Sequence, residues 1–296
     1  MAFVITDLDN IVSAAFPELL QEVFGSATTL SDFNIIPGAT NGSRVPLLDQ
    51  SLNFTITSDP ASLATDTATT TLSDNSVSMY QFHSRVELDP QSIRNTILGG
   101  QNAGDETVFF ANSITNNIST QTPLAIETFA WSGETGVYNG LITEASASAG
   151  GQTTADAFSA TDTAAMNIGR LETIIAANDN LLEGGILYTS AAQIRAYGSA
   201  VGVSAANGFT QAGIQNLGAG SFVDPVFGLT MKPIHGYTGT ARILTPTNNL
   251  YMGVDTAANQ TAIDAWYSQD DRRLKYQLDF FVGPLFGRFD NVTYNG

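Results

Sequence analysis

Residues 270–296 read DDRRLKYQLDFFVGPLFGRFDNVTYNG, and this stretch decides the fold that we predict for the chain. Apolar and polar residues alternate from Leu274 to Val282, which is the period-two pattern of a half-buried β-strand. Gly283 and Pro284 are predicted to break or bend this strand, and a second extended piece follows over residues 286–294. A long strand so late in the chain is expected to close a sheet begun far earlier. The alternative is an ordinary terminal strand of a mixed domain.

Composition restricts the function classes. The chain has 296 residues, of which 43% are hydrophobic and only 13% are charged, so Ser, Thr, Asn, Gln and Gly must supply most of its polar surface. A formal charge of −17 argues against binding nucleic acid through phosphate contacts. The absence of cysteine excludes disulfides, thiolate metal sites and thiol nucleophiles. Residues 1–25 carry acids and no bases, unlike a signal or transit peptide, and a soluble cytoplasmic product is expected.

The first third of the sequence predicts segments that cannot form a core of their own. Residues 11–23 have helical spacing, and the irregular stretch that follows is expected to lie on another surface as an arm. Residues 52–56 and 77–80 alternate weakly around a polar middle, which indicates the two strands of a long hairpin that needs a partner surface. A flexible surface loop is the alternative for this segment.

The remainder alternates between helices and short strands, which favours an α+β domain. Asp89 and Pro90 are typical of a helix start, and a longer helix is predicted from Asp105 to about Thr122, where Pro123 ends or kinks it. Loops are expected over 145–151 and 198–221. A helix capped by Thr161 or Asp162 should bury Ala165, Ile168, Leu171, Ile174 and Ile175, and Ser190 should cap another. Strands are predicted at 186–188, 225–234 and 250–254.

No catalytic or metal-binding constellation is recognisable. His83 and His235 are the only histidines, and neither has clustered carboxylates beside it. The segment Asp7-Leu8-Asp9 lacks the glycine of a calcium loop, and Gly218-Ala219-Gly220 lacks the third glycine of a dinucleotide site. We therefore predict no enzyme activity and no cofactor, and we expect a structural or binding role.

The order of these parts resembles the major capsid proteins of tailed phages, which share the Hong Kong 97-like fold. The matching local sequences are GILYTS from Gly185, PVFGL from Pro225, LYMGVD from Leu250 and the basic, aromatic strand that follows. The resemblance implies an α+β fold with an N-terminal arm (1–49), an extended loop (50–82), a peripheral domain with a spine helix and long sheet (83–136 and 247–296) and an axial domain (137–246).

The resemblance further implies a structural protein that self-assembles into hexamers and pentamers of an icosahedral phage head, enclosing double-stranded DNA without reading its sequence. Portal, separate scaffolding and decoration proteins are the implied partners, and the virion, assembled in the host cytoplasm, is the implied location. An encapsulin-type shell and a secreted adhesion domain are the alternatives. No lysine lies in the extended loop, so no covalent cross-link is expected there. Subunit contacts are expected at Phe16, Arg44, Leu52, Phe54, Tyr80, Arg85, Arg272, Arg273 and Lys275.

Overall fold

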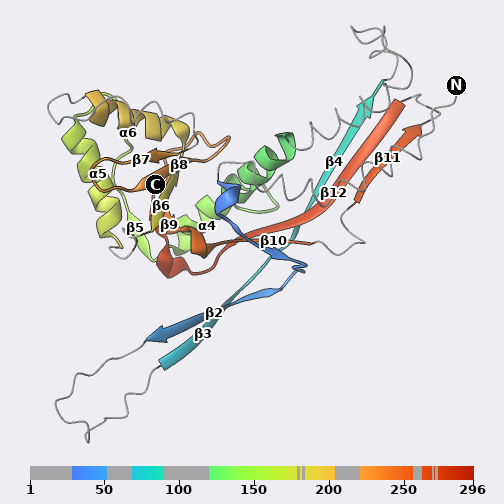
Figure 1. Ribbon diagram of the computed structural model, residues 1–296, viewed down its shortest axis with the longest axis horizontal. Coiled ribbons are helices and arrows are strands. Elements are labelled where there is room, and N and C mark those ends of the chain that lie inside the picture. The colour runs from blue at the N-terminus through green and yellow to red at the C-terminus, as the bar shows by residue number, and fades with distance from the viewer. Residues whose placement is uncertain are drawn as a thin grey trace, which may run out of the picture.

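The computed structural model describes residues 29–51, 69–89, 120–178, 181, 184–203, 221–255, 262–268, 270 and 273–296. These residues form an elongated body with a sheet towards each end, and a two-stranded hairpin projects away from it (Figure 1). None of the described helices is both long and apolar enough to cross a membrane.

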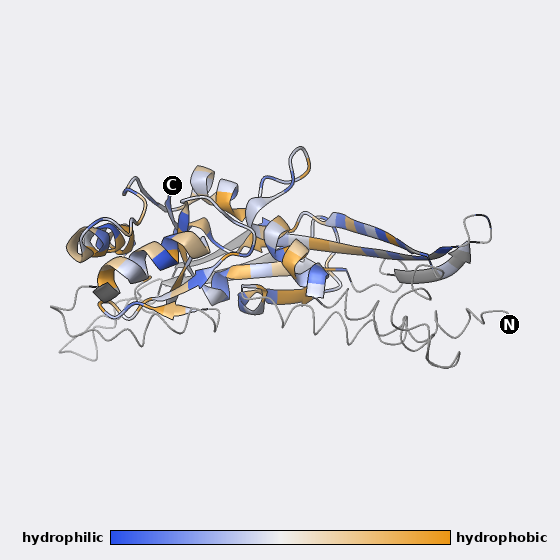
Figure 2. Cartoon of the chain, turned by 90° about the horizontal axis from the view of Figure 1, so that it is seen from above, coloured by the Kyte–Doolittle hydropathy of each residue, from blue (hydrophilic) through white to orange (hydrophobic). Residues whose placement is uncertain are grey.

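The long sheet is built around β12, Arg273–Phe286. On one side β12 pairs antiparallel with β4, Tyr80–Leu88; on the other it pairs antiparallel with β11, Ala262–Ser268, and with β10, Leu250–Val254. The short β1, Asn34–Pro37, adds to β10 in parallel. Figure 2 shows hydrophilic and hydrophobic residues alternating along the extended part of this sheet, as expected for strands with one apolar and one polar face.

The predicted break at Gly283 and Pro284 is wrong, since β12 runs through both residues to Phe286. β4 pairs with β12 only as far as Val282, so Pro284 lies where β12 has a described neighbour on one side alone. A proline is tolerated at such a position because no ladder on the open side needs its missing N–H.

The second sheet has the strand order β5-β13-β9-β6-β8-β7. These strands are β5, Gly151–Thr153; β13, Thr293–Asn295; β9, Arg242–Pro246; β6, Gly185–Thr189; β8, Thr230–Pro233; and β7, Phe222–Val223. The second extended piece predicted after Pro284 is thus mostly not a strand, and its end, β13, lies in this other sheet between β5 and β9. Short 3-10 helices occupy Leu30–Asp32, Thr247–Asn249 and Phe289–Asn291.

Three helices accompany the second sheet: α4, Leu141–Ser148; α5, Ala164–Ala176; and α6, Ala191–Val203. Ser190 caps α6 as predicted, with Gln193 N–H 3.4 Å from its Oγ. The cap of α5 is Thr163, not Thr161 or Asp162, because the Thr163 hydroxyl accepts from Met166 N–H. Leu171, Ile174 and Ile175 of the predicted inward face are buried, whereas Ala165 is exposed, and Asn167, which was not predicted, is buried.

Other predicted boundaries also change. Residues 120–132 are helical through Pro123, so the predicted end of a helix at about Thr122 is wrong, and Ile126 and Trp131 are buried on the later turns. Residues 145–148 belong to α4 rather than to a loop, and α6 extends into the loop predicted at 198–221. A turn occupies residues 225–227 at the start of the predicted 225–234 strand, of which only 230–233 form a strand, β8. The strands predicted at 186–188 and 250–254 are confirmed as β6 and β10.

The core has two main clusters, one at each sheet. The first joins the long sheet to the 120–132 helix and α4, with Trp131 fully buried against Tyr188 at a ring separation of 4.8 Å. The second lies between α5, α6 and the second sheet, and includes Leu171, Ile174 and Tyr197. Because Tyr188 of β6 belongs to the first cluster, the two sheets share packing rather than a flexible linker.

The projecting hairpin consists of β2, Arg44–Ser51, and β3, Thr69–Ser76, paired antiparallel from Arg44↔Ser76 to Ser51↔Thr69. Its strands therefore begin earlier than predicted, and Tyr80 belongs to β4 of the long sheet. The predicted strand at 52–56 lies outside the described residues, as do the helices predicted within 11–23, from Asp89, and from 105 to 119.

Candidate functional site at the hairpin base

The hairpin leaves the body at Val77, which crosses over the long sheet. Val77 N–H donates to Ser43 C=O and Val77 C=O accepts from Gly42 N–H, both at 2.8 Å. The side chain is buried above Gly253 and Gly283, which are register partners in β10 and β12. A Cβ on Gly283 would lie 2.5 Å from Ser78 O and 2.6 Å from Val77 Cγ1. The glycine that looks like a strand breaker in the sequence is instead required for this crossing.

Asn75, near the end of β3, ties the hairpin to the end of β12. Its side-chain amide donates to Phe286 C=O and to Gly287 C=O, each at 2.9 Å. Both acceptor residues are buried, so these two bonds satisfy carbonyls that water would reach poorly. The direction in which the hairpin projects is therefore fixed at its base.

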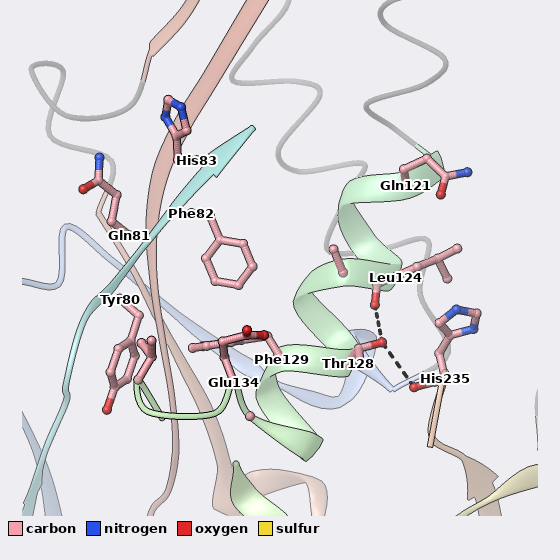
Figure 3. A pocket seen from close by; sticks show the side chains of 13 residues that line it. Tyr80, Gln81, Phe82, His83, Gln121, Leu124, Thr128, Phe129, Glu134 and His235 are labelled. Atoms are coloured by element: carbon pink, nitrogen blue, oxygen red, sulfur yellow. Dashed lines mark hydrogen bonds between the residues drawn. The ribbon is translucent and has the colours of Figure 1, made fainter. Parts of the chain in front are cut away.

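A groove of about 660 Å³ lies between β4 and the 120–132 helix, and Tyr80 is among the residues that line it (Figure 3). Its floor is aromatic: the Phe82 ring lies 4.8 Å from Phe129, edge to face, and 5.1 Å from Phe280, stacked. The lining also includes the polar His83, Gln121, Glu134 and His235. Aromatic surface with polar groups at its edge is typical of a protein contact surface.

Nothing in this groove indicates catalysis. His83 Nδ1 is engaged with Asp279 at 2.5 Å, and the Thr128 hydroxyl donates to Leu124 C=O at 2.8 Å. Among the described residues there is also no group of three or more side chains able to hold a metal ion.

A second pocket of about 200 Å³ lies directly at the hairpin base. It is lined by Asn75, Ser76, Ser78, Tyr80, Tyr138, Glu144, Pro284, Leu285, Phe286 and Phe289. Burial raises the pKa of Glu144 to about 7, and the nearby Tyr138 hydroxyl offsets part of that rise. Burial likewise raises the pKa of Tyr138, whose hydroxyl is inaccessible to solvent and has no hydrogen-bond partner of good geometry.

The polar face of the long sheet carries a cluster of three cations around one carboxylate. Glu87 lies 3.0 Å from Arg273, 3.4 Å from Arg85 and 3.5 Å from Lys275. The hydrogen bond from Arg273 is the main reason that the pKa of Glu87 is lowered. Arg85 also lies 5.4 Å above the Trp266 ring. Sequence reasoning found the cations and missed Glu87, because only the β4–β12 register places it opposite Lys275.

The arrangement of the whole chain matches chains in solved structures. The match to a chain of the satellite phage P4 procapsid including the size determination (Sid) protein has 11% identity and a TM-score of 0.60, and covers 95% of this chain and 98% of that one. A chain of the capsid of Myoviridae phage XM1 matches with 9% identity and a TM-score of 0.57, covering 91% of both. A chain of the native GTA particle capsid matches with 12% identity and a TM-score of 0.50, over 90% and 89%.

This chain has the Hong Kong 97-like capsid fold. No protein-family model matches the sequence, and no match was found among curated proteins. The Hong Kong 97-like fold is therefore carried here by a sequence that shares about a tenth of its residues with those chains.

Within the Hong Kong 97-like fold, the predicted contact residues fall into three groups. Arg85, Arg273 and Lys275 come together around Glu87 within one chain. Arg44 begins β2 and Tyr80 begins β4 beside the hairpin base. The others lie outside the described residues: Phe16, Leu52, Phe54 and Arg272. Contacts of all nine with neighbouring subunits stay predictions.

Proposed function

We propose that this chain is a major capsid protein, which self-assembles into the hexamers and pentamers of an icosahedral phage head that encloses double-stranded DNA. The observation that carries the proposal is the match to a chain of a phage procapsid structure over nearly the full length of both chains. A match of this extent includes both sheets, so it supports a role for the complete fold rather than for one shared motif.

Features of the structure support a role in assembly. The hairpin projects into solvent from a rigid base, although two strands by themselves are marginally stable in water and need a partner surface. The groove along β4 offers aromatic surface of the kind that protein interfaces bury. In a closed shell each such contact is weak, but many of them act together.

The domain division follows from the same proposal. We assign residues 1–49 to the arm, 50–82 to the extended loop, 83–136 and 247–296 to the peripheral domain, and 137–246 to the axial domain. The strands of the hairpin suggest that the extended loop begins nearer Arg44, and the pairing of β13 with β9 suggests that residues 293–295 belong with the axial sheet.

The proposed partners are other copies of the chain, a portal, a separate scaffolding protein and decoration proteins, and the proposed location is the virion after assembly in the host cytoplasm. The net charge of −17 suits a wall around DNA, because a wall that repels phosphate leaves the genome free to enter and leave.

Electron microscopy of the expressed protein tests this function. We expect rings or closed icosahedral shells, alone or with a scaffolding protein, and no tight retention of DNA in high salt. A chain that stays monomeric across protein concentration, salt and scaffold would overturn the proposal. Shells that fill with a specific partner enzyme instead of DNA would favour an encapsulin-type container.

A further inference from the structure

The smaller pocket at the hairpin base contains an ionisable group without a counter-charge. Glu144, in the first turn of α4, is the one charged residue among those that line it; the other titratable groups there are Tyr80 and Tyr138. In the described part of the chain no cation forms an ion pair with the Glu144 carboxylate. A partly buried carboxylate that lacks a counter-charge is costly, so it either takes up a proton or receives a cation from outside the subunit.

The pocket also contains a buried hydroxyl beside this carboxylate. Tyr138 is 7% exposed, and its hydroxyl, which lies near Glu144, makes no hydrogen bond of good geometry. The backbone of Tyr138 is held by reciprocal hydrogen bonds with Glu134. Volume is available, because about 200 Å³ exceeds the space of several water molecules, each of which takes about 30 Å³ in the liquid.

We propose that this pocket binds the guanidinium group of an arginine from a second copy of the chain, with Glu144 as its counter-ion and Tyr138 beside it. A guanidinium presents several N–H donors in a plane, which suits a carboxylate and a neighbouring phenol oxygen at once. The proposal rests on the proposed function, because a shell supplies the second copy.

An arginine is favoured over a lysine by the chain's own inventory. It has only two lysines, and both are engaged: Lys232 Nζ lies 2.6 Å from Asp32 Oδ1, and the buried Lys275 pairs with Glu87. Arginines are more numerous and more accessible. Arg85 and Arg273 share one carboxylate while about half of each side chain is exposed, and Arg195 contacts a backbone carbonyl of its own helix.

The proposed contact between Glu144 and a guanidinium lies at the hairpin base, and this position makes it relevant to assembly. The residues around Glu144 include Asn75 and the last residues of β12, which together hold the hairpin base. A guanidinium bound here would join the neighbouring subunit to the point from which the hairpin projects. Subunit association and hairpin direction would then depend on one ion pair.

Glu144→Gln in the full chain tests the proposal by the pH dependence of assembly. Because a bound guanidinium requires the ionised carboxylate, association of the parent chain should weaken as the pH falls from 8 to 6, through the pKa of Glu144 near 7. The Gln variant should require about tenfold or more protein to assemble at pH 8 and should lose this pH dependence. Glu144→Asp should restore part of it. Glu172→Gln, at an exposed position on α5, is the matched control and should behave like the parent.

The stability of the unassembled subunit should change with pH in the opposite direction. A carboxyl whose folded pKa is raised stabilises the fold at low pH and loses that contribution as the pH rises through about 7. Subunits of the parent chain should therefore resist denaturant better at pH 6 than at pH 8, and Glu144→Gln should reduce this difference. Assembly that shared the pH trend of subunit stability would overturn the inference.

A density map of assembled particles at pH 8 shows which group occupies the pocket beside Glu144. We expect an arginine of a neighbouring copy within hydrogen-bond distance of Glu144. Particles in which the pocket holds only water, or a residue of the same chain, would overturn this inference and leave the proposed function standing. A chain that forms no particles under any condition would overturn both.

Discussion

Gly283 shows how one residue can be misread from sequence and then explained by its surroundings. Beside a proline it has the pattern of a turn, yet it lies within β12. A glycine is needed at this position because Val77 and the Ser78 carbonyl occupy the space where a Cβ would be. The information that decides its role comes from a segment about 200 residues earlier, which local pattern cannot supply.

We therefore expect Gly283→Ala to destabilise the subunit by about 1–3 kcal/mol, because the added methyl group forces the crossing segment away from the sheet. Denaturant unfolding of the soluble subunit measures the effect. Gly169→Ala is the matched control: Gly169 lies inside α5 with open space around it, and the change should stabilise the helix by about 0.5–1 kcal/mol. Equal effects of the two substitutions would contradict the close packing at Gly283.

At the scale of elements, the hairpin and its attachment are separate features. The strands of the hairpin pair with each other over their whole described length, whereas the attachment depends on Val77 and on the two hydrogen bonds of Asn75. The base can therefore be weakened while the hairpin itself is left intact.

Asn75→Ala should cost about 1–3 kcal/mol, because it leaves the buried Phe286 and Gly287 carbonyls without their donor. Hydrogen exchange should become faster at residues 77–79 while β4 keeps its rate, and denaturant unfolding should give the magnitude. Ser76→Ala, at an exposed position on the same strand, should change stability by less than about 0.5 kcal/mol. Unchanged exchange at 77–79 in the Asn75 variant would show that Val77 alone holds the base.

The elements that the sequence predicted well are those with a local signal. Alternation located β12, and the Ser190 cap located the start of α6. The failures involve tertiary contacts: β13 was expected to extend one sheet and lies in the other, and Glu87 was overlooked beside Lys275. Strand register across the chain decides both, and no local window contains it.

At the scale of the molecule, the two sheets and the projecting hairpin have different relations to the core. The sheets share a cluster that includes Trp131 and Tyr188, so they should unfold together. Beyond its base the hairpin projects away from the body that holds both sheets (Figure 1). Its removal should therefore affect association far more than folding.

Replacing residues 46–74 with Asn-Gly tests this separation. The Val45↔Asn75 pair is retained, and a two-residue turn can join paired strands of this kind. We expect a folded subunit whose denaturation midpoint lies close to that of the parent chain and which forms no closed shell, as measured by light scattering and electron microscopy. Normal shells from the shortened chain would remove the hairpin from the assembly mechanism.

The placement of β12 and β13 also governs when a newly made chain can fold. β12 lies between β4 on one side and β10 and β11 on the other, and β13 lies between β5 and β9, so each joins strands that the ribosome has already released. Both sheets must wait with unpaired edges until these residues emerge, and pairing across some 190 positions is intrinsically slow. A nascent chain is then exposed to misassociation for most of its synthesis, and slower translation should lengthen this exposure and increase the need for cellular chaperones.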